Sequence, residues 1–225
     1  MRILAIDTAL EACSVVLMDG DAIVARETQA MARGHAEALM PMIARVREAA
    51  ALDFATLDRI AVTVGPGSFT GLRSGIAAAR GIGLATGKPV VGITTLSAFA
   101  APLIAEDTTT PVVAVIDARH DHVYLQAFDR DGTTRLQPSF LPISEAVHVM
   151  AASGPRLVGN AASMLAAAWP AESPGPAAVT DRPAPGIEWV ARLGAVADPV
   201  SAPPKPLYLR PPDAQPQKAA QVARQ

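Results

Sequence analysis

The chain has 225 residues, 50% of them hydrophobic and 18% charged, which suffices for one large domain or two small ones with a sizeable core. A net charge of −2 excludes the clustered Lys/Arg footprint of a protein that binds nucleic acid on its own. A transmembrane helix needs about 20 apolar residues in succession, and no such run occurs. The single cysteine, Cys13, cannot form an internal disulfide, and the short, early-charged N-terminus is not typical of a secretory signal. We therefore expect a cytoplasmic protein.

Apolar patterning in the first half of the chain predicts alternating strands and helices. In chain order, we expect strands at 2–6, 14–18 and 22–28, a helix at about 34–51, a strand at 60–64, a helix from the following glycine loop to about 86, a strand at 89–93 and a helix that begins at Thr94 or Thr95. Pro41 lies inside the first of these helices, so either a kink or a start nearer Leu39 is expected.

The pattern then restarts. The second half predicts strands at 112–117, 122–128 and near 134–136, a helix at 143–152, a strand at 156–158, and helices at 161–169 and 187–196. Two halves that each run β-β-β-α-β-α predict an α/β fold of two duplicated lobes with mixed central sheets, an N-terminal lobe at 1–104 and a C-terminal lobe at 105–210. The proline-rich stretch 199–216 predicts extended coil, and we expect residues 211–225 to be a disordered tail.

A glycine-rich loop, Gly65-Pro66-Gly67-Ser68-Phe69-Thr70-Gly71, joins a strand to a helix as phosphate-binding loops do. It has no lysine where a Walker loop needs one, and it misses the G-x-G-x-x-G spacing of dinucleotide-binding loops by one residue. Backbone amides at the helix start can still attract an anion. The alternative is a loop that lets two backbone segments touch.

Small residues continue from the loop into the helix. Gly71, Gly75, Ala79 and Gly83 recur at every fourth position and so share one helix face. Because each glycine costs about 1 kcal/mol relative to alanine in a helix, this stripe needs a compensating contact. Close packing within the chain is one explanation. The other is a helix-to-helix contact between subunits that also involves the helix at 34–51, which carries more apolar residues than one buried face requires.

Residues that could carry chemistry are present but lack partners. His35 is followed by Leu39 at the position where a helical metal site needs a second histidine, and His120, His122 and His148 match no ligand spacing. Cys13 and Ser68 have no base at a recognisable spacing. We therefore predict no catalytic, cofactor-binding or metal-binding residue.

Two aspartates, Asp7 and Asp117, end the first strand of each half, where duplicated actin-like folds carry metal–phosphate carboxylates. Those folds use a glycine two positions later, and here Ala9 and Arg119 stand in its place. The missing glycines disfavour a kinase or ATPase.

Several segments together resemble the TsaB (YeaZ) family of bacterial threonylcarbamoyladenosine tRNA modification. They are Ile6-Asp7-Thr8-Ala9-Leu10-Glu11-Ala12-Cys13-Ser14, the 65–73 run Gly-Pro-Gly-Ser-Phe-Thr-Gly-Leu-Arg, Gly92-Ile93-Thr94-Thr95-Leu96, Ile116-Asp117-Ala118-Arg119 and Pro206-Leu207-Tyr208-Leu209-Arg210. The resemblance implies a two-lobed actin-like (ASKHA) fold and a non-catalytic scaffold for the catalytic subunit TsaD, which is a paralogue of the same fold.

The resemblance also implies how such a scaffold works. N-lobe helices contact TsaD, with His35, Leu39, Ile43, Val46, Gly71, Gly75 and Ala79 as the expected contact residues here, and the same face can form a homodimer. The ATPase TsaE joins the complex, TsaC or Sua5 supplies threonylcarbamoyl-adenylate, and tRNA binds only to the complex. A nucleotide at the subunit junction stays open. The alternatives are the catalytic transferase subunit itself and, with less support, a metallopeptidase.

Overall fold

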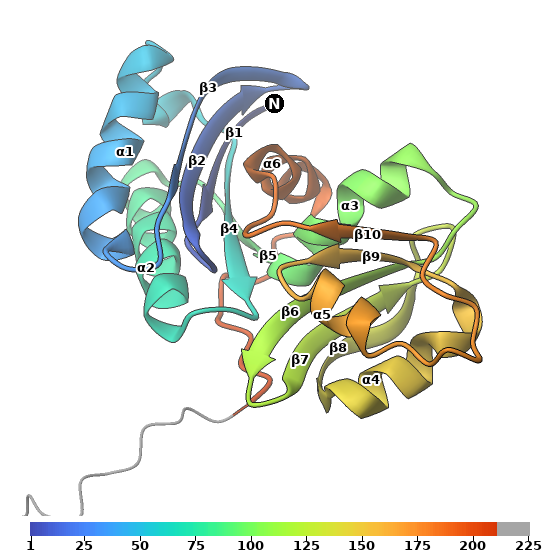
Figure 1. The fold of residues 1–225 in the computed structure, drawn as a ribbon. Helices are drawn as coiled ribbons and strands as arrows, with labels where there is room; N and C mark the ends of the chain where they lie inside the picture. Colours follow the sequence, from blue (N-terminus) through green and yellow to red (C-terminus); the bar gives the residue numbers. More distant parts are fainter. Residues whose placement is uncertain (211–225) are drawn as a thin grey trace, which may run out of the picture.

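The structure, a computed structural model, describes residues 1–210 and contains two five-stranded sheets with helices on their faces (Figure 1). The first sheet has the order β3-β2-β1-β4-β5 and consists of β1 (Arg2–Asp7), β2 (Ala12–Asp19), β3 (Ala22–Ala30), β4 (Arg59–Gly65) and β5 (Val90–Thr94). β1 pairs antiparallel with β2 and parallel with β4, so the sheet is mixed, as predicted.

The second sheet repeats this arrangement. It has the order β10-β9-β6-β7-β8 and consists of β6 (Val112–Arg119), β7 (His122–Phe128), β8 (Thr134–Pro142), β9 (Arg156–Gly159) and β10 (Ala178–Asp181). β6 pairs antiparallel with β7 and parallel with β9, just as β1 does with β2 and β4. The predicted duplication of the α/β lobe is therefore confirmed.

The repeating unit written as β-β-β-α-β-α leaves out the last strand and helix of each lobe, although the individually predicted elements include all of these except β10. The first lobe contains α1 (His35–Ala49) and α2 (Phe69–Thr86), and then β5 is followed by α3 (Thr95–Glu106). The second contains α4 (Ile143–Met150) and α5 (Ala162–Ala167), and then β10 is followed by α6 (Ile187–Val196). Two short 3-10 turns lie at Phe54–Thr56 and Ala151–Ser153. The prediction missed β10 because four residues after a Pro/Gly-rich stretch show no usable alternation.

The first sheet is covered on both faces. Side chains that alternate along β1 divide between two cores: Leu4 and Ile6 pack with α1 and α2, while Ile3 and Ala5 pack with α6. α1 begins after Gly34, whose φ of 86° is left-handed, and it continues through Pro41 to Ala49. α2 begins at the N-cap Ser68, whose side chain accepts a hydrogen bond from the Gly71 amide.

The two lobes share helices across their boundary. α6 packs on the first sheet, whereas α3 packs through Leu96 and Phe99 on β6 of the second sheet, and the two helices contact each other between the sheets (Figure 1). The predicted C-terminal lobe, 105–210, thus includes a helix that contributes to the core of the first sheet.

The segment 199–210 contains neither helix nor strand, as the proline content predicts. It returns along the first lobe, where the Gly92 amide donates to the Ala202 carbonyl at 2.9 Å and the Leu207 amide donates to the Val64 carbonyl at 2.7 Å. Its end reaches the second lobe, where Arg210 Nη1 donates to the Ala118 carbonyl at 3.1 Å. This segment therefore connects the ends of β4 and β6. The predicted disordered tail, 211–225, lies outside the described residues.

Candidate functional site

The glycine loop lies against the β1–β2 connection, and its polar groups bond to that connection. The Ser68 amide donates to the Ala9 carbonyl at 2.7 Å, and the Thr8 hydroxyl donates to the Gly71 carbonyl at 2.7 Å. A Cβ on Gly67 would lie 2.3 Å from the Ala9 carbonyl oxygen. The loop is thus glycine-rich because two backbone segments touch, which was one of the two predicted explanations.

The stripe of small residues on α2 faces the sheet. A Cβ on Gly71 would lie 2.1 Å from the Thr8 carbonyl oxygen, one on Gly75 would lie 2.4 Å from the Thr8 hydroxyl, and one on Gly83 would lie 2.4 Å from Val90. Ala79 is completely buried. Close packing within the chain therefore accounts for the stripe.

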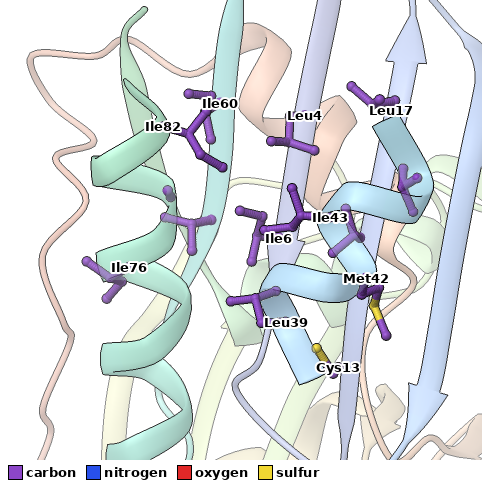
Figure 2. Close-up of a cluster of buried hydrophobic side chains, with 14 of the residues drawn as sticks. Leu4, Ile6, Cys13, Leu17, Leu39, Met42, Ile43, Ile60, Ile76 and Ile82 are labelled. Carbon is purple, nitrogen blue, oxygen red and sulfur yellow. The ribbon is translucent and has the colours of Figure 1, made fainter. Parts of the chain in front are cut away.

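The predicted contact residues on α1 are also core residues. Leu39 and Ile43 point from α1 toward β1 and β2, in the cluster that contains Leu4 and Ile6 (Figure 2). Val46 joins the same cluster. His35 is buried as well, and its Nε2 lies 2.9 Å from the Leu10 carbonyl.

All seven residues predicted as partner contacts (His35, Leu39, Ile43, Val46, Gly71, Gly75 and Ala79) are therefore buried inside the chain. A side chain packed against its own sheet does not reach the surface of its helix, so a role of these seven residues as partner contacts stays a prediction. The period of the apolar pattern identified the inner faces of α1 and α2 correctly. The interface itself remains a prediction that now concerns the outer faces.

The outer faces of α1 and α2 combine small side chains with a few exposed apolar ones. Ala36 and Ala44 on α1, and Ala77 and Gly81 on α2, are exposed. Met40 and Leu84 are 53% and 88% exposed, respectively, and Leu84 adjoins a groove between α2 and β5.

Asp7 is the buried polar centre of the first lobe. Its Oδ1 accepts hydrogen bonds from the Thr63 hydroxyl at 2.6 Å and the Ala9 amide at 3.0 Å, whereas no partner for Oδ2 is found within residues 1–210. Burial raises the pKa of this carboxyl above its ordinary value of 3.8, although the two hydrogen bonds and the nearby His35 oppose the shift. The side chain is thus enclosed by the chain's own groups.

Asp117, its counterpart in the second lobe, is held by its own turn. Its Oδ1 accepts from the Arg119 amide at 2.7 Å, and its Oδ2 lies 3.3 Å from Arg119 Nη1. The Asp117 amide in turn donates to the side-chain oxygen of Asn160 at 2.9 Å. Arg119 therefore occupies the position where the missing glycine would bring the hairpin close to a phosphate.

The remaining candidate residues do not assemble into a site. His122 Nδ1 lies 2.6 Å from the His120 carbonyl, and His148 lies in α4, a helix that packs on β7 and β8. Burial raises the pKa of Cys13 to about 11, with smaller contributions from Asp7 and Glu27. Within the described part of the chain, no three His, Cys, Asp or Glu side chains are grouped so that they could hold a metal ion. No helix between residues 1 and 210 is long and apolar enough to span a membrane.

One surface cluster was not predicted. Phe69, Arg73 and Tyr208 meet at the start of α2, with Phe69 and Tyr208 stacked at a centroid distance of 5.2 Å. Tyr208 belongs to one of the motifs that carry the family resemblance, but no local pattern links it to Arg73, which lies 135 residues earlier.

Comparisons with known proteins agree with this architecture. The sequence model of the family described as TsaD, tRNA N6-adenosine threonylcarbamoyltransferase, matches residues 22–171. The chain is 39% identical over 131 residues to the tRNA threonylcarbamoyladenosine biosynthesis protein TsaB of Escherichia coli, a match that covers 58% of this chain and little more than half, 56%, of that protein. An uncharacterized protein of Mycobacterium tuberculosis is 37% identical over 217 residues, which cover 95% of this chain and 94% of the relative.

Among solved structures, YeaZ from Pseudomonas aeruginosa superimposes with a TM-score of 0.76 at 27% identity, covering 92% of this chain and 99% of that chain. The two duplicated lobes, each with its first strand between an antiparallel hairpin and a parallel strand, define a two-lobed actin-like α/β protein. The chain belongs to the tRNA N6-adenosine threonylcarbamoyltransferase family and, within it, to the TsaB (YeaZ) group.

Proposed function

We propose that this chain is the non-catalytic scaffold subunit of the bacterial complex that forms N6-threonylcarbamoyladenosine beside the anticodon of tRNAs that read codons beginning with A. In this role it binds and supports TsaD, which performs the transfer. The names of its TsaB relatives and of the matching family support a place in this modification pathway.

The main support for the non-catalytic role comes from the C-terminal end of β1, where Asp7 and the neighbouring loop form hydrogen bonds within the chain. Asp7 is bonded to Thr63 and Ala9, and the loop backbone bonds to Thr8 and Ala9 in front of it. Asp7 Oδ1 and the neighbouring loop groups, at the position where an actin-like enzyme faces a phosphate, are thus bonded within the chain.

The outer faces of α1 and α2 are the surface that we propose for TsaD. Exposed Ala36, Ala44, Ala77 and Gly81 let a partner helix approach closely, because short side chains keep helix axes near each other. At the C-terminal end of α2, the groove beside Leu84 is lined by Val90, Pro204 and the cations Arg80 and Lys88, and it extends this surface. Such a mixture of apolar centre and charged rim is typical of interfaces between subunits.

The other expectations follow from the same assignment. We propose that TsaE joins the assembly, that TsaC or Sua5 supplies the activated threonylcarbamoyl group, and that tRNA binds only to the assembled complex in the cytoplasm. A homodimer through the same helices would compete with TsaD when the chain is alone. A nucleotide at the junction of the subunits is compatible with this arrangement.

The second candidate is the catalytic transferase subunit itself, which the name of the matching family favours. A metallopeptidase has less support and rests on one solved relative from Pseudomonas aeruginosa, an uncharacterized protein described as similar to peptidase YeaZ. Both alternatives require reactive groups on this chain, and one reconstitution can distinguish the scaffold from the transferase.

That experiment combines TsaC or Sua5, TsaD, TsaE, tRNA, threonine, bicarbonate and ATP, with and without this chain, and measures the modified nucleoside by mass spectrometry. We expect product only when this chain and TsaD are both present, and we expect the Asp7→Asn variant to give the wild-type yield. Product from this chain without TsaD would establish the catalytic alternative. Full product without this chain would refute the scaffold role.

A further inference from the structure

The cluster at the start of α2 holds an arginine in one position. The guanidinium carbon of Arg73 lies 3.7 Å from the centre of the Phe69 ring, and Arg73 Nε donates a hydrogen bond to the Tyr208 hydroxyl at 3.1 Å. The Phe69 and Tyr208 rings stack with an angle of 29° between their planes. Because two groups contact the guanidinium, the long arginine side chain loses most of its freedom before any partner arrives.

Tyr208 reaches this position through the C-terminal segment. The Leu207 amide donates to the Val64 carbonyl at 2.7 Å, which fixes the backbone beside the glycine loop. Attachment of this C-terminal segment to the start of α2 explains why Phe69 stacks on Tyr208. It does not explain Arg73, because its Nη1 and Nη2 have no acceptor and no ion pair within residues 1–210. Phe69 and Tyr208 are also 39% and 43% exposed, respectively, so the cluster is open at the surface.

An arginine that is oriented, exposed and without an anion is suited to receive one. The two terminal nitrogens of a guanidinium form a planar fork that matches the two oxygens of a carboxylate. Arginines of this kind, supported by aromatic rings, are frequent among the residues that contribute most to protein–protein affinity.

The position of Arg73 on α2 indicates which kind of anion it binds. Arg73, Ala77, Arg80 and Leu84 follow one another at intervals of three or four residues and are all exposed, so they share the outer face of α2. That face is the surface proposed above for the partner subunit, whereas the chain's net charge of −2 does not favour a polyanion such as RNA.

We propose that Arg73, oriented by Phe69 and Tyr208, is an anchor that binds an Asp or Glu side chain of the partner subunit in a bidentate ion pair. This inference rests on the proposed function, since it concerns the same interface. It also assigns a role to the C-terminal segment, which completes the anchor by supplying the Tyr208 hydroxyl.

The test measures the dissociation constant of the full-length chain for TsaD by calorimetry at physiological salt. We expect Arg73→Ala to weaken binding by about 30-fold or more, Arg73→Lys by about tenfold because the planar fork is lost, and Tyr208→Phe by about threefold to tenfold because one orienting hydrogen bond is lost. Arg192→Ala is the matched control, since Arg192 lies 5.0 Å over the Trp189 ring on α6, away from α1 and α2. The melting temperatures of all variants should stay within about 2 °C of wild type.

Each result of this experiment either supports or overturns the proposed anchor. If the wild-type chain binds TsaD and Arg73→Ala binds equally well, the anchor is wrong and the proposed function stands. If the wild-type chain does not bind TsaD, the proposed function fails, and this inference fails with it. If Arg73→Ala keeps its affinity for TsaD while the complex loses affinity for tRNA, the anion is a phosphate and the carboxylate assignment is overturned.

Discussion

Replacing Gly71 by alanine tests the packing of α2 on the sheet. The added Cβ would lie 2.1 Å from the Thr8 carbonyl oxygen, whereas ordinary contacts begin at 3.4 Å. The obstacle is backbone in the first lobe's most buried hairpin, so the helix has to move away as a whole. Overpacking of this kind costs about 1–3 kcal/mol, and loss of the hydrogen bond from the Thr8 hydroxyl to the Gly71 carbonyl costs about 1 kcal/mol more. We therefore expect the free energy of unfolding to fall by about 2–4 kcal/mol.

The matched control is Gly81→Ala on the outer face of the same helix, where a Cβ would meet nothing within 4 Å. Here alanine should stabilise the protein by about 0.5–1 kcal/mol, because it favours helix without creating a clash. Urea unfolding followed by tryptophan fluorescence, to which Trp189 on α6 and Trp169 in the second lobe both contribute, measures both variants. A wild-type midpoint for Gly71→Ala, or equal destabilisation by both variants, would refute the packing argument.

Three further variants test the other assignments. Asp7→Asn should stabilise the protein by a margin that grows as pH rises above 3.8. Because the pKa of Asp7 is raised, the folded wild type binds the proton more tightly than the unfolded chain, so wild-type stability declines from pH 3.8 up to the folded pKa. A stability margin that shrinks as pH rises would contradict the burial argument. Ile43→Glu should prevent folding, because it places a carboxylate in the core. Leu84→Glu, at an 88% exposed site, should leave the melting temperature unchanged and weaken binding to TsaD. Circular dichroism measures folding and calorimetry measures binding, and normal folding of Ile43→Glu would refute the place of Ile43 in the core. Native Cys13 should resist alkylation at pH 8 and react only in urea, because its thiol is buried and its pKa is about 11; rapid labelling of the folded protein would show that β2 opens.

The sequence predicted the architecture to the extent that local patterns determine it. Buried strands such as Arg2–Asp7, and the restart of the pattern at Val112, suffice for the duplication, because alternation and periodicity are properties of single elements. The exchange of α3 and α6 between the two sheets was not predictable in this way. An apolar helix face shows that something covers it, but not which of two similar sheets does so.

The candidate site likewise has features that the sequence predicted and features that it could not predict. The missing lysine after the glycine loop was sufficient to disfavour a Walker-type loop, since such loops are recognised by residues next to one another. The cluster of Phe69, Arg73 and Tyr208 depends on a contact across 135 residues that only the path of the C-terminal coil creates. A proline-rich segment has no periodicity from which to infer where it packs.

The two faces of α2 explain why the predicted contact residues are buried while the idea of a contact surface is retained. Small residues lie on both faces, and spacing alone cannot tell which ones have a neighbour. Gly71 and Gly75 have no room for a Cβ, so their cost of about 1 kcal/mol each is offset within the chain. Gly81 is different, because it has free space around it and gains nothing from the chain's own contacts. If a partner helix lies on this face, Gly81→Ala should raise the melting temperature and yet weaken binding to TsaD, and a variant that is both more stable and equally well bound would show that no partner approaches there.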